Sequence, residues 1–308
     1  MNPQESKIIF YAKRSFPEKI NATFEFIQEN WKVLLKYSAY LILPICLIQA
    51  ITVNAITDLI YYPQTVQNAG NWLAYGPVFF VNYGLTVLLG LAGSLLSISI
   101  VYTLMAKYNE REERLAGIAF AGLKPGLLKR LKRGLFVMLF TVVILSLAGG
   151  VIVLLGVVSR YTLLVSIPLF VASTIPLLLF TPVYLFEEIG IMRAFAKTFR
   201  LGFATWMGVL IIFIIMGVIS SIVSAVVSIP WIATSVVKYI FLLSDMQDET
   251  AISTGYSLMH YAFGVIMAFG SYLSGIFVTV GLAYQYAHAR EKAGNGSLVD
   301  NIDNLEQL

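Results

Sequence analysis

Apolar residues of the chain collect in six long runs that are separated by polar stretches. Each run is at least as long as the roughly 20 residues that a helix needs to cross the hydrocarbon core of a bilayer. We predict membrane-spanning helices at 33–56, 77–105, 135–158, 163–186, 205–229 and 256–285. The expected fold is all-α: a polytopic membrane protein with six transmembrane helices, in a single membrane domain over 1–308 with tails 1–32 and 286–308.

The composition supports this assignment. Of the 308 residues, 58% are hydrophobic and 12% are charged, and the mean hydropathy is +0.80. Soluble domains carry roughly a quarter charged residues, so the composition argues against a soluble enzyme. The first 30 or so residues are polar and the first apolar run exceeds a signal-peptide core of ~7–15 residues, so we expect the first span to be retained.

The distribution of basic residues predicts the orientation, because Lys and Arg resist translocation. With six spans, 19 of the 21 basic residues fall on one side, and only Arg160 and Lys238 fall on the other. Both termini are therefore predicted to be cytoplasmic. A single cysteine, Cys46, excludes an intrachain disulfide. Short loops and retained spans suit a bacterial inner membrane.

Amphipathic stretches precede the three spans that enter from the cytoplasm. Their apolar faces are Ile20, Phe24, Ile27 and Trp31; then Leu123, Leu127, Leu128 and Leu131; then Met192, Phe195, Ala196, Phe199 and Phe203. Ser15 and Glu18 form a capping box that predicts a helix start. One interpretation is three repeated units, each an in-plane amphipathic helix followed by a transmembrane hairpin. The other is that any span entering from the cytoplasm tends to have such a lead-in.

Apolar residues also recur at helical spacing in 230–245, while Thr234, Ser235 and Lys238 lie elsewhere on the helical wheel. This pattern favours a helix that lies in the outer interface over a seventh span. A short re-entrant segment is the alternative.

Two features predict how the spans are built. The fourth span contains Pro168, Pro176 and Pro182, and each proline removes a backbone donor, so we expect this helix to be kinked or unwound. The fifth and sixth spans carry small residues every four positions, which allow close helix approach, so we expect these two helices to pack together or to form a dimer face. These are Ser220, Ser224 and Ser228 in the fifth span, and the pairs Gly270 with Ser274 and Ser271 with Gly275 in the sixth.

The residues around the fourth and fifth spans match a known sequence pattern. They include Pro182, Glu187 and Glu188, then Ala194, Lys197, Thr198, Phe199, Arg200 and Leu201, then Trp206 and an apolar run to Pro230. This resembles the membrane-domain superfamily that includes the membrane portion of glycerophosphodiester phosphodiesterases and the YciC-like inner-membrane proteins. In that pattern an acidic residue closes one span and an Ala-x-x-x-Ser-aromatic-x-Leu helix leads into the next. Here Thr198 replaces the Ser.

The stretch 15–35 also looks like the lead-in of that superfamily. The resemblance implies a six-helix membrane domain whose function is poorly defined. In the phosphodiesterases of the group, catalysis belongs to a separate soluble domain. The loops and tails of this chain are too short to hold one, so the activity is not carried over.

No catalytic, cofactor or metal constellation is visible in the sequence. The cores of the six predicted spans contain no Asp, Glu, Lys or Arg, whereas coupled transporters usually keep an ionisable residue there. There is no HExxH motif and no Cys/His cluster. His260 is expected to form interfacial hydrogen bonds. We expect no enzyme activity and no cofactor.

The leading hypothesis is a non-catalytic membrane organiser or accessory factor that contacts anionic lipids and partner proteins. Its candidate lipid-headgroup contacts are Lys129, Arg130, Lys132, Arg133, Arg193, Lys197 and Arg200. Basic residues close to a negative leaflet are each worth about 1 kcal/mol, although these seven could serve topology alone. Expected partners are membrane lipids and a second copy or another membrane protein, with no nucleic acid.

The alternative hypothesis is a transporter or channel for a small or amphipathic solute. Its site would be lined by Gln49, Asn82 and the proline-broken fourth helix at Pro176. Broken helices at mid-membrane occur at transporter sites.

Overall fold

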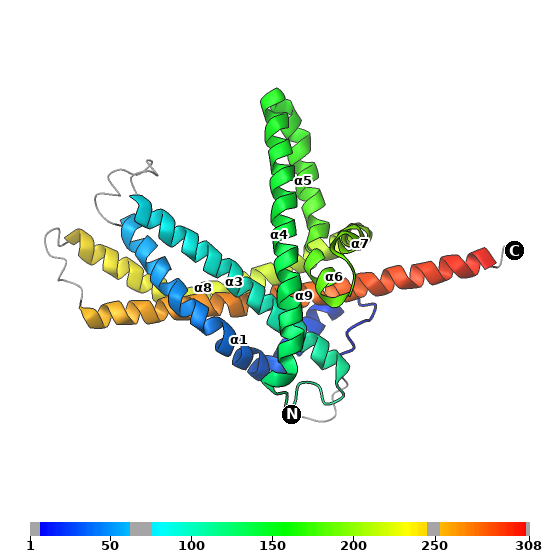
Figure 1. The fold of residues 1–308 in the computed structure, drawn as a ribbon, viewed down its shortest axis with the longest axis horizontal. Coiled ribbons are helices and arrows are strands. Elements are labelled where there is room, and N and C mark those ends of the chain that lie inside the picture. Colours follow the sequence, from blue (N-terminus) through cyan, green and yellow to red (C-terminus); the bar gives the residue numbers. More distant parts are fainter. Residues whose placement is uncertain (1–6, 62–75, 245–252, 306–308) are drawn as a thin grey trace. The chain divides into compact units, whose positions relative to one another are not determined.

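The computed structural model is built almost entirely from helices (Figure 1). It describes residues 7–61, 76–244 and 253–305, with side chains for 7–60, 76–241 and 253–294, and no strand occurs among them. The helices are α1 (Phe16–Tyr61), α3 (Gly76–Glu110), α4 (Phe120–Val158), the short 3-10 helix η2 (Arg160–Thr162), α5 (Leu163–Leu177), α6 (Phe180–Phe186), α7 (Ile191–Ala204), α8 (Trp206–Ser244) and α9 (Thr254–Leu305).

Six helical segments in the described part of the chain are long and apolar enough to span a membrane. They are Phe16–Ile60, Gly76–Glu110, Phe120–Val158, Arg160–Phe186, Trp206–Phe241 and Thr254–Gly294. Each contains one predicted span, except that the fifth predicted span begins at 205, one residue before α8. The all-α polytopic fold is confirmed, and the chain is an integral membrane protein.

The fourth span is broken, as its prolines predict. α5 ends at Leu177, the chain turns at Leu178 and Leu179, and α6 begins at Phe180. In an unbroken helix the nitrogen of Pro182 would face the carbonyl of Leu178, but proline has no N–H to donate and its ring clashes there. Pro182 instead occupies the first turn of α6, where the N–H groups have no helical partner.

Only one of the three predicted lead-ins is a separate helix. α7 ends before Thr205, whose backbone (φ −132°, ψ 29°) leaves the helical region before α8 begins. The lead-ins of the first and third spans instead continue into the spans as α1 and α4. For those two copies the repeated unit of a separate helix plus a hairpin is wrong, because α1 and α4 each run without a break from lead-in to span, in α4 even across Pro125. One half of the capping box is confirmed, since the Ser15 N–H donates to Glu18 Oε2 at 2.7 Å.

Contacts between residues divide the chain into two compact units. Unit 1 comprises 1–34, 99–217 and 277–308, and unit 2 comprises 35–98 and 218–276. Helices α4 to α7 belong entirely to unit 1, whereas α1, α3, α8 and α9 each contribute to both units. The single membrane domain over 1–308 stays a prediction.

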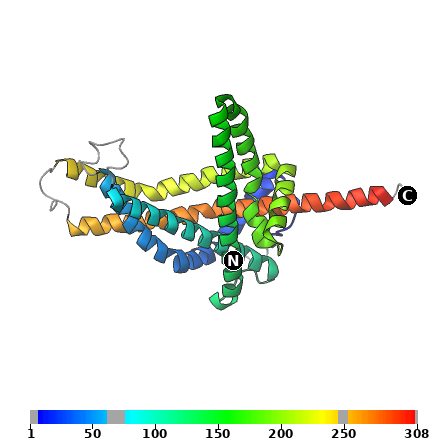
Figure 2. The same cartoon turned by 45° about the horizontal axis from the view of Figure 1, so that its top comes forward.

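In unit 1, α4 and α5 lie side by side as an antiparallel hairpin, and α7 packs against α5 and α6 (Figure 2). The contact of α7 with α5 depends on Gly202. A Cβ atom at this position would lie 2.6 Å from Pro176 Cα, so only glycine permits the observed approach of the two backbones.

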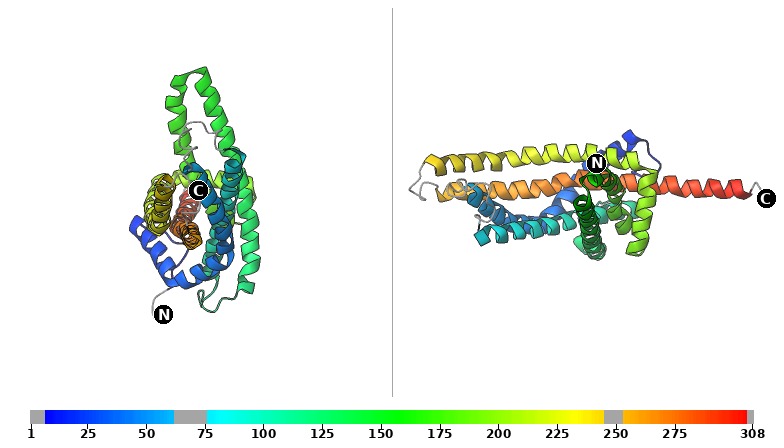
Figure 3. Two further views of the ribbon diagram at one scale, coloured as in Figure 1. Left: turned by 90° about the vertical axis from the view of Figure 1, so that its left-hand side faces the viewer. Right: turned by 90° about the horizontal axis from the view of Figure 1, so that it is seen from above.

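In unit 2, α8 and α9 run side by side (Figure 3), and their small residues face one another. Ser224 Oγ lies 3.2 Å from Ser271 Oγ, and a Cβ at Gly270 would lie 2.3 Å from Val227 Cγ1. The prediction that the small-residue stripes pack these two helices together is confirmed.

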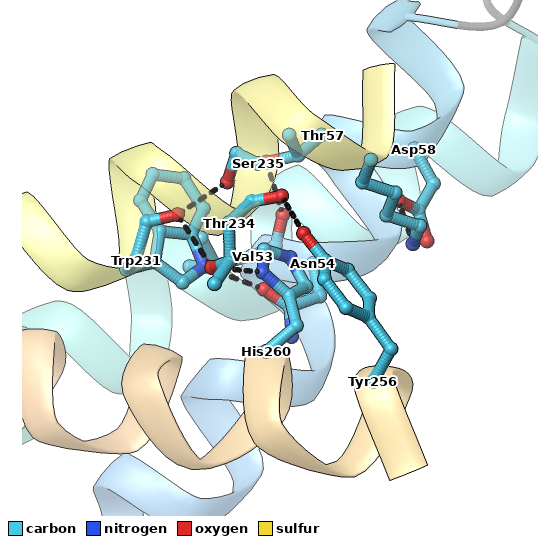
Figure 4. Close-up of polar contacts among 10 residues, drawn as sticks. Val53, Asn54, Thr57, Asp58, Trp231, Thr234, Ser235, Tyr256 and His260 are labelled. Atoms are coloured by element: carbon cyan, nitrogen blue, oxygen red, sulfur yellow. Dashed lines mark hydrogen bonds and ion pairs between the residues drawn. The ribbon is translucent and has the colours of Figure 1, made fainter. Parts of the chain in front are cut away.

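Residues 230–244 continue α8 as one helix, so the interpretation of 230–245 as a separate interfacial or re-entrant segment is wrong up to Ser244. The predicted polar face points into unit 2, where Thr234 and Ser235 are buried (Figure 4). Conversely, Ile232, Val236 and Ile240 are exposed. The polar face is internal because its side chains hydrogen-bond to α1 and α9, which holds the helix beyond Pro230. Residue 245 lies outside the described residues.

We predict that Gly202→Ala destabilises unit 1 by about 1–3 kcal/mol, because the added methyl group overpacks the α5–α7 contact. Thermal unfolding in mild detergent measures the effect. Gly217→Ala is the matched control, since a Cβ at this position in α8 meets no atom within 4 Å. Equal unfolding temperatures for the two variants would contradict the proposed contact.

Candidate functional site

The Glu187 carboxylate joins three elements of unit 1. Glu187 follows α6 directly, and only 10% of its side chain is exposed. Its Oε2 accepts a hydrogen bond from Lys197 Nζ of α7 at 2.8 Å, and its Oε1 accepts one from the Tyr286 hydroxyl of α9 at 2.8 Å. A shielded carboxylate requires such partners, so this residue fixes α7 and α9 to the end of the fourth span.

Arg133 supports the same place from α4. Its guanidinium donates to the backbone carbonyls of Tyr184, Glu187 and Ile189 at 2.6–3.0 Å, and it lies 3.8 Å from the centroid of the Tyr184 ring. The last carbonyls of a helix lack helical partners, and Arg133 satisfies them at the end of α6.

The buried face of α7 consists of residues of the pattern described in the sequence. Ala194, Thr198 and Leu201 are buried against α5 and α6. The acidic residue of the pattern is Glu187, which pairs with Lys197 of the same helix. The pattern therefore has a structural basis in this chain: it seats α7 on the broken fourth span.

The seven predicted headgroup contacts fall into distinct groups. Arg133 and Lys197 bind protein atoms internally, as described above. Lys129 forms an ion pair with Glu188 in which both side chains are exposed, and hydrogen bonding to this lysine lowers the pKa of Glu188. Arg130 lies over the Phe186 ring, 6.0 Å from its centroid. The other three, Lys132, Arg193 and Arg200, are exposed and form no ion pair among the described residues.

The side of α7 opposite its buried face carries an apolar stripe with a basic border. Met192, Ala196 and Phe203 share this stripe by helical spacing, and Met192 and Phe203 are 68% and 56% exposed. Arg193 and Arg200, seven residues apart, lie next to it. We call these five residues the α7 outer face. An apolar stripe beside basic side chains is typical of a helix at a membrane surface.

A pocket of about 380 Å³ opens where α7 gives way to α8. Its lining includes residues 203–208 of this junction, Lys19 of α1, and Gln285, His288 and Lys292 of α9. All of these residues belong to unit 1. No acidic residue lines the pocket, so its charge is positive.

Two of the polar residues that line the pocket are tightly buried. Lys19 is 4% exposed and donates to Gln285 Oε1 at 2.8 Å, and Gln285 is fully buried. His288 Nδ1 accepts a hydrogen bond from the backbone N–H of Arg14 at 3.1 Å. This bond places the proton of a neutral imidazole on Nε2, which is then a donor. Burial lowers the pKa of the Arg14 guanidinium, which lies over the Tyr284 ring.

No family model, curated protein or solved structure matches this chain. The candidate sites therefore depend on the geometry of the chain itself.

The residues of the solute-site hypothesis are engaged elsewhere. Gln49 Oε1 accepts a hydrogen bond from the Tyr272 hydroxyl at 2.7 Å, and its amide lies near Gly90 of α3. Asn82 is eight residues from Gly90, or about 12 Å along the helix, and its side chain donates to the Val78 carbonyl. Pro176 belongs to unit 1, where it contacts Gly202.

A polar cluster in unit 2 ties α1, α8 and α9 together (Figure 4). The Trp231 indole donates to Asn54 Oδ1 at 2.8 Å and stacks on His260. His260 Nδ1 lies 2.9 Å from Thr234 Oγ1, and the Tyr256 hydroxyl donates to the Thr234 carbonyl. The expected hydrogen bonding of His260 is confirmed by its contact with Thr234, whereas its position at the membrane interface stays a prediction. The contacts of these residues give the cluster a packing role.

The residues of the pocket are not recognisable as a group from the sequence. Lys19 is separated from Gln285 by 266 positions, and nothing local connects them. Part of the pocket lining does have a sequence signal. The spacing of Gln285, His288 and Lys292, at i, i+3 and i+7, places three polar residues on one face of α9.

We predict that Glu187 and Lys197 are energetically coupled. In a double-mutant cycle with Glu187→Gln and Lys197→Gln, denaturant unfolding is expected to give a coupling of about 1–3 kcal/mol, because both groups are shielded. The adjacent pair Glu188 and Lys129 is the control, with 79% and 53% exposed side chains, and its coupling is expected to be much weaker because solvent screens both charges. Equal coupling in the two pairs would refute the anchoring role of Glu187.

Proposed function

We propose that this integral membrane protein is a non-catalytic organiser or accessory factor whose α7 outer face contacts anionic lipids. In this proposal the chain lies in a bacterial inner membrane, with both termini in the cytoplasm and α7 in the plane of the cytoplasmic leaflet. It belongs to the membrane-domain superfamily that its sequence resembles. A second copy of the chain or another membrane protein completes the set of partners.

One observation carries the proposal. Met192 and Phe203 are exposed on the side of α7 that faces away from the protein, and Arg193 and Arg200 border them without an ion pair among the described residues. Exposing large apolar side chains to water is unfavourable, whereas the headgroup boundary accommodates both kinds of side chain. The anchoring of α7 by Glu187 keeps this face pointing outwards.

Charge strengthens the contact. The cytoplasmic leaflet is negative, and a basic residue close to it gains about 1 kcal/mol. Arg193 and Arg200 are available for this role because their guanidinium groups are exposed, whereas Lys197 of the same helix is bound to Glu187. In α7, Lys197 thus supports the fold internally, whereas Arg193 and Arg200 contact lipid.

We predict that Arg193→Gln with Arg200→Gln weakens the preference for anionic lipid by up to about 30-fold, since two charges of about 1 kcal/mol each are removed. The measurement is energy transfer from tryptophan to pyrene-labelled phosphatidylglycerol, relative to labelled phosphatidylcholine, in proteoliposomes. Arg160→Gln, which removes an exposed charge beside the other end of α4, is the control. An unchanged preference in the double variant would refute the proposal.

A further inference from the structure

The pocket of unit 1 contains donors that no group among the described residues satisfies. The first hydrogen bond on entering α8 runs from the Val209 N–H to the Thr205 carbonyl, at 3.0 Å. The preceding N–H groups, of Trp206, Met207 and Gly208, have no partner within the helix. Thr205 does not cap them, because its hydroxyl donates to the Leu201 carbonyl at 2.9 Å. A helix start of this kind attracts an anion through its free donors and its dipole.

The buried amide of Gln285 is a second, independent feature. An ammonium group can only donate, so the contact with Lys19 fixes the Gln285 oxygen toward that lysine and turns Nε2 away from it. Nε2 is buried and has no hydrogen-bond partner in the described part of the chain. It points toward the start of α8, where a Cβ at Gly208 would lie 2.9 Å from it. Leaving a buried donor unpaired is unfavourable, so a ligand with an acceptor oxygen would stabilise this amide.

The charges of the pocket have no acidic counterpart. Lys19 is almost completely buried, and its described partner is the neutral amide oxygen of Gln285. Lys292 adds a second ammonium group at the exposed side. A buried cation without an anion is costly, so a negatively charged ligand would stabilise this arrangement.

We propose that this pocket binds the phosphate group of a ligand, held by the start of α8, the ammonium groups of Lys19 and Lys292, and the Gln285 amide. Phosphate offers several acceptor oxygens and one to two negative charges, which matches this set of donors. The volume of about 380 Å³ leaves space for an organic remainder. Phe203 and Met207 are exposed members of the lining and provide an apolar rim for it.

The phosphate could belong to a phospholipid headgroup or to a soluble compound, and the pocket goes beyond the α7 outer face because its donors are different residues. The test uses the full-length protein in nonionic detergent. Calorimetric titration with inorganic phosphate gives one arm, and native mass spectrometry of retained phosphatidylglycerol, against phosphatidylcholine, gives the other. The variants are Gln285→Leu and Lys292→Gln. Lys292 is exposed, so its variant tests binding with the fold intact.

We expect one bound ligand per chain and an affinity reduced about tenfold or more in each variant, since each removes one strong donor. Lys124→Gln, which replaces an exposed lysine of α4, is expected to bind as the unsubstituted protein does. Binding of phosphatidylglycerol alone identifies the ligand as a lipid, and binding of phosphate alone identifies it as a soluble compound. Each of these results supports the site.

Absence of binding in both arms, or equal binding by both variants and the unsubstituted protein, would overturn the proposal. The double variant Arg193→Gln with Arg200→Gln is expected to retain the pocket ligand. This variant therefore distinguishes failure of the pocket proposal from failure of the proposed lipid contact by the α7 outer face.

Discussion

The shielded carboxylate of Glu187 is the interaction on which unit 1 depends. A carboxylate this far from solvent is stable only with donors around it, and Lys197 and Tyr286 supply them from two helices. Arg133 binds the carbonyl of the same residue from a third helix. The end of the broken fourth span therefore becomes the point at which α4, α7 and α9 are joined.

This junction determines what α7 presents to its surroundings. With Ala194, Thr198 and Leu201 buried, the apolar stripe and its two arginines must face away from the protein. The same seating places the end of α7 at Thr205, so the start of α8 lies beside Lys19 and Gln285. The proposed lipid-contact face and the proposed phosphate pocket are thus two consequences of one anchored helix.

The sequence predicted the features that depend on local chemistry. Periodicity or the properties of single residues predict four of these features. They are the six spans, the break caused by Pro182, the contact of Ser15 with Glu18, and the small residues that pack α8 on α9. Features that depend on long-range partners could not be predicted in this way. Arg133 and Lys197 look like other basic residues until the carbonyls and the carboxylate that they bind are known. Thr234 and Ser235 have the sequence pattern of a solvent-exposed face, and their burial follows only from the positions of the neighbouring helices.

The most direct test is the depth of α7 in the bilayer. Spin labels at Met192→Cys, Ala196→Cys and Phe203→Cys, in reconstituted protein whose native Cys46 is buried, report depth through their accessibility to oxygen and to a water-soluble nickel chelate. Residues 192 and 203 are separated by about 16 Å along the helix. A helix in the plane of the leaflet predicts the same headgroup-level depth at all three positions. A steady change in depth along the series, or full exposure to the aqueous reagent, would contradict it.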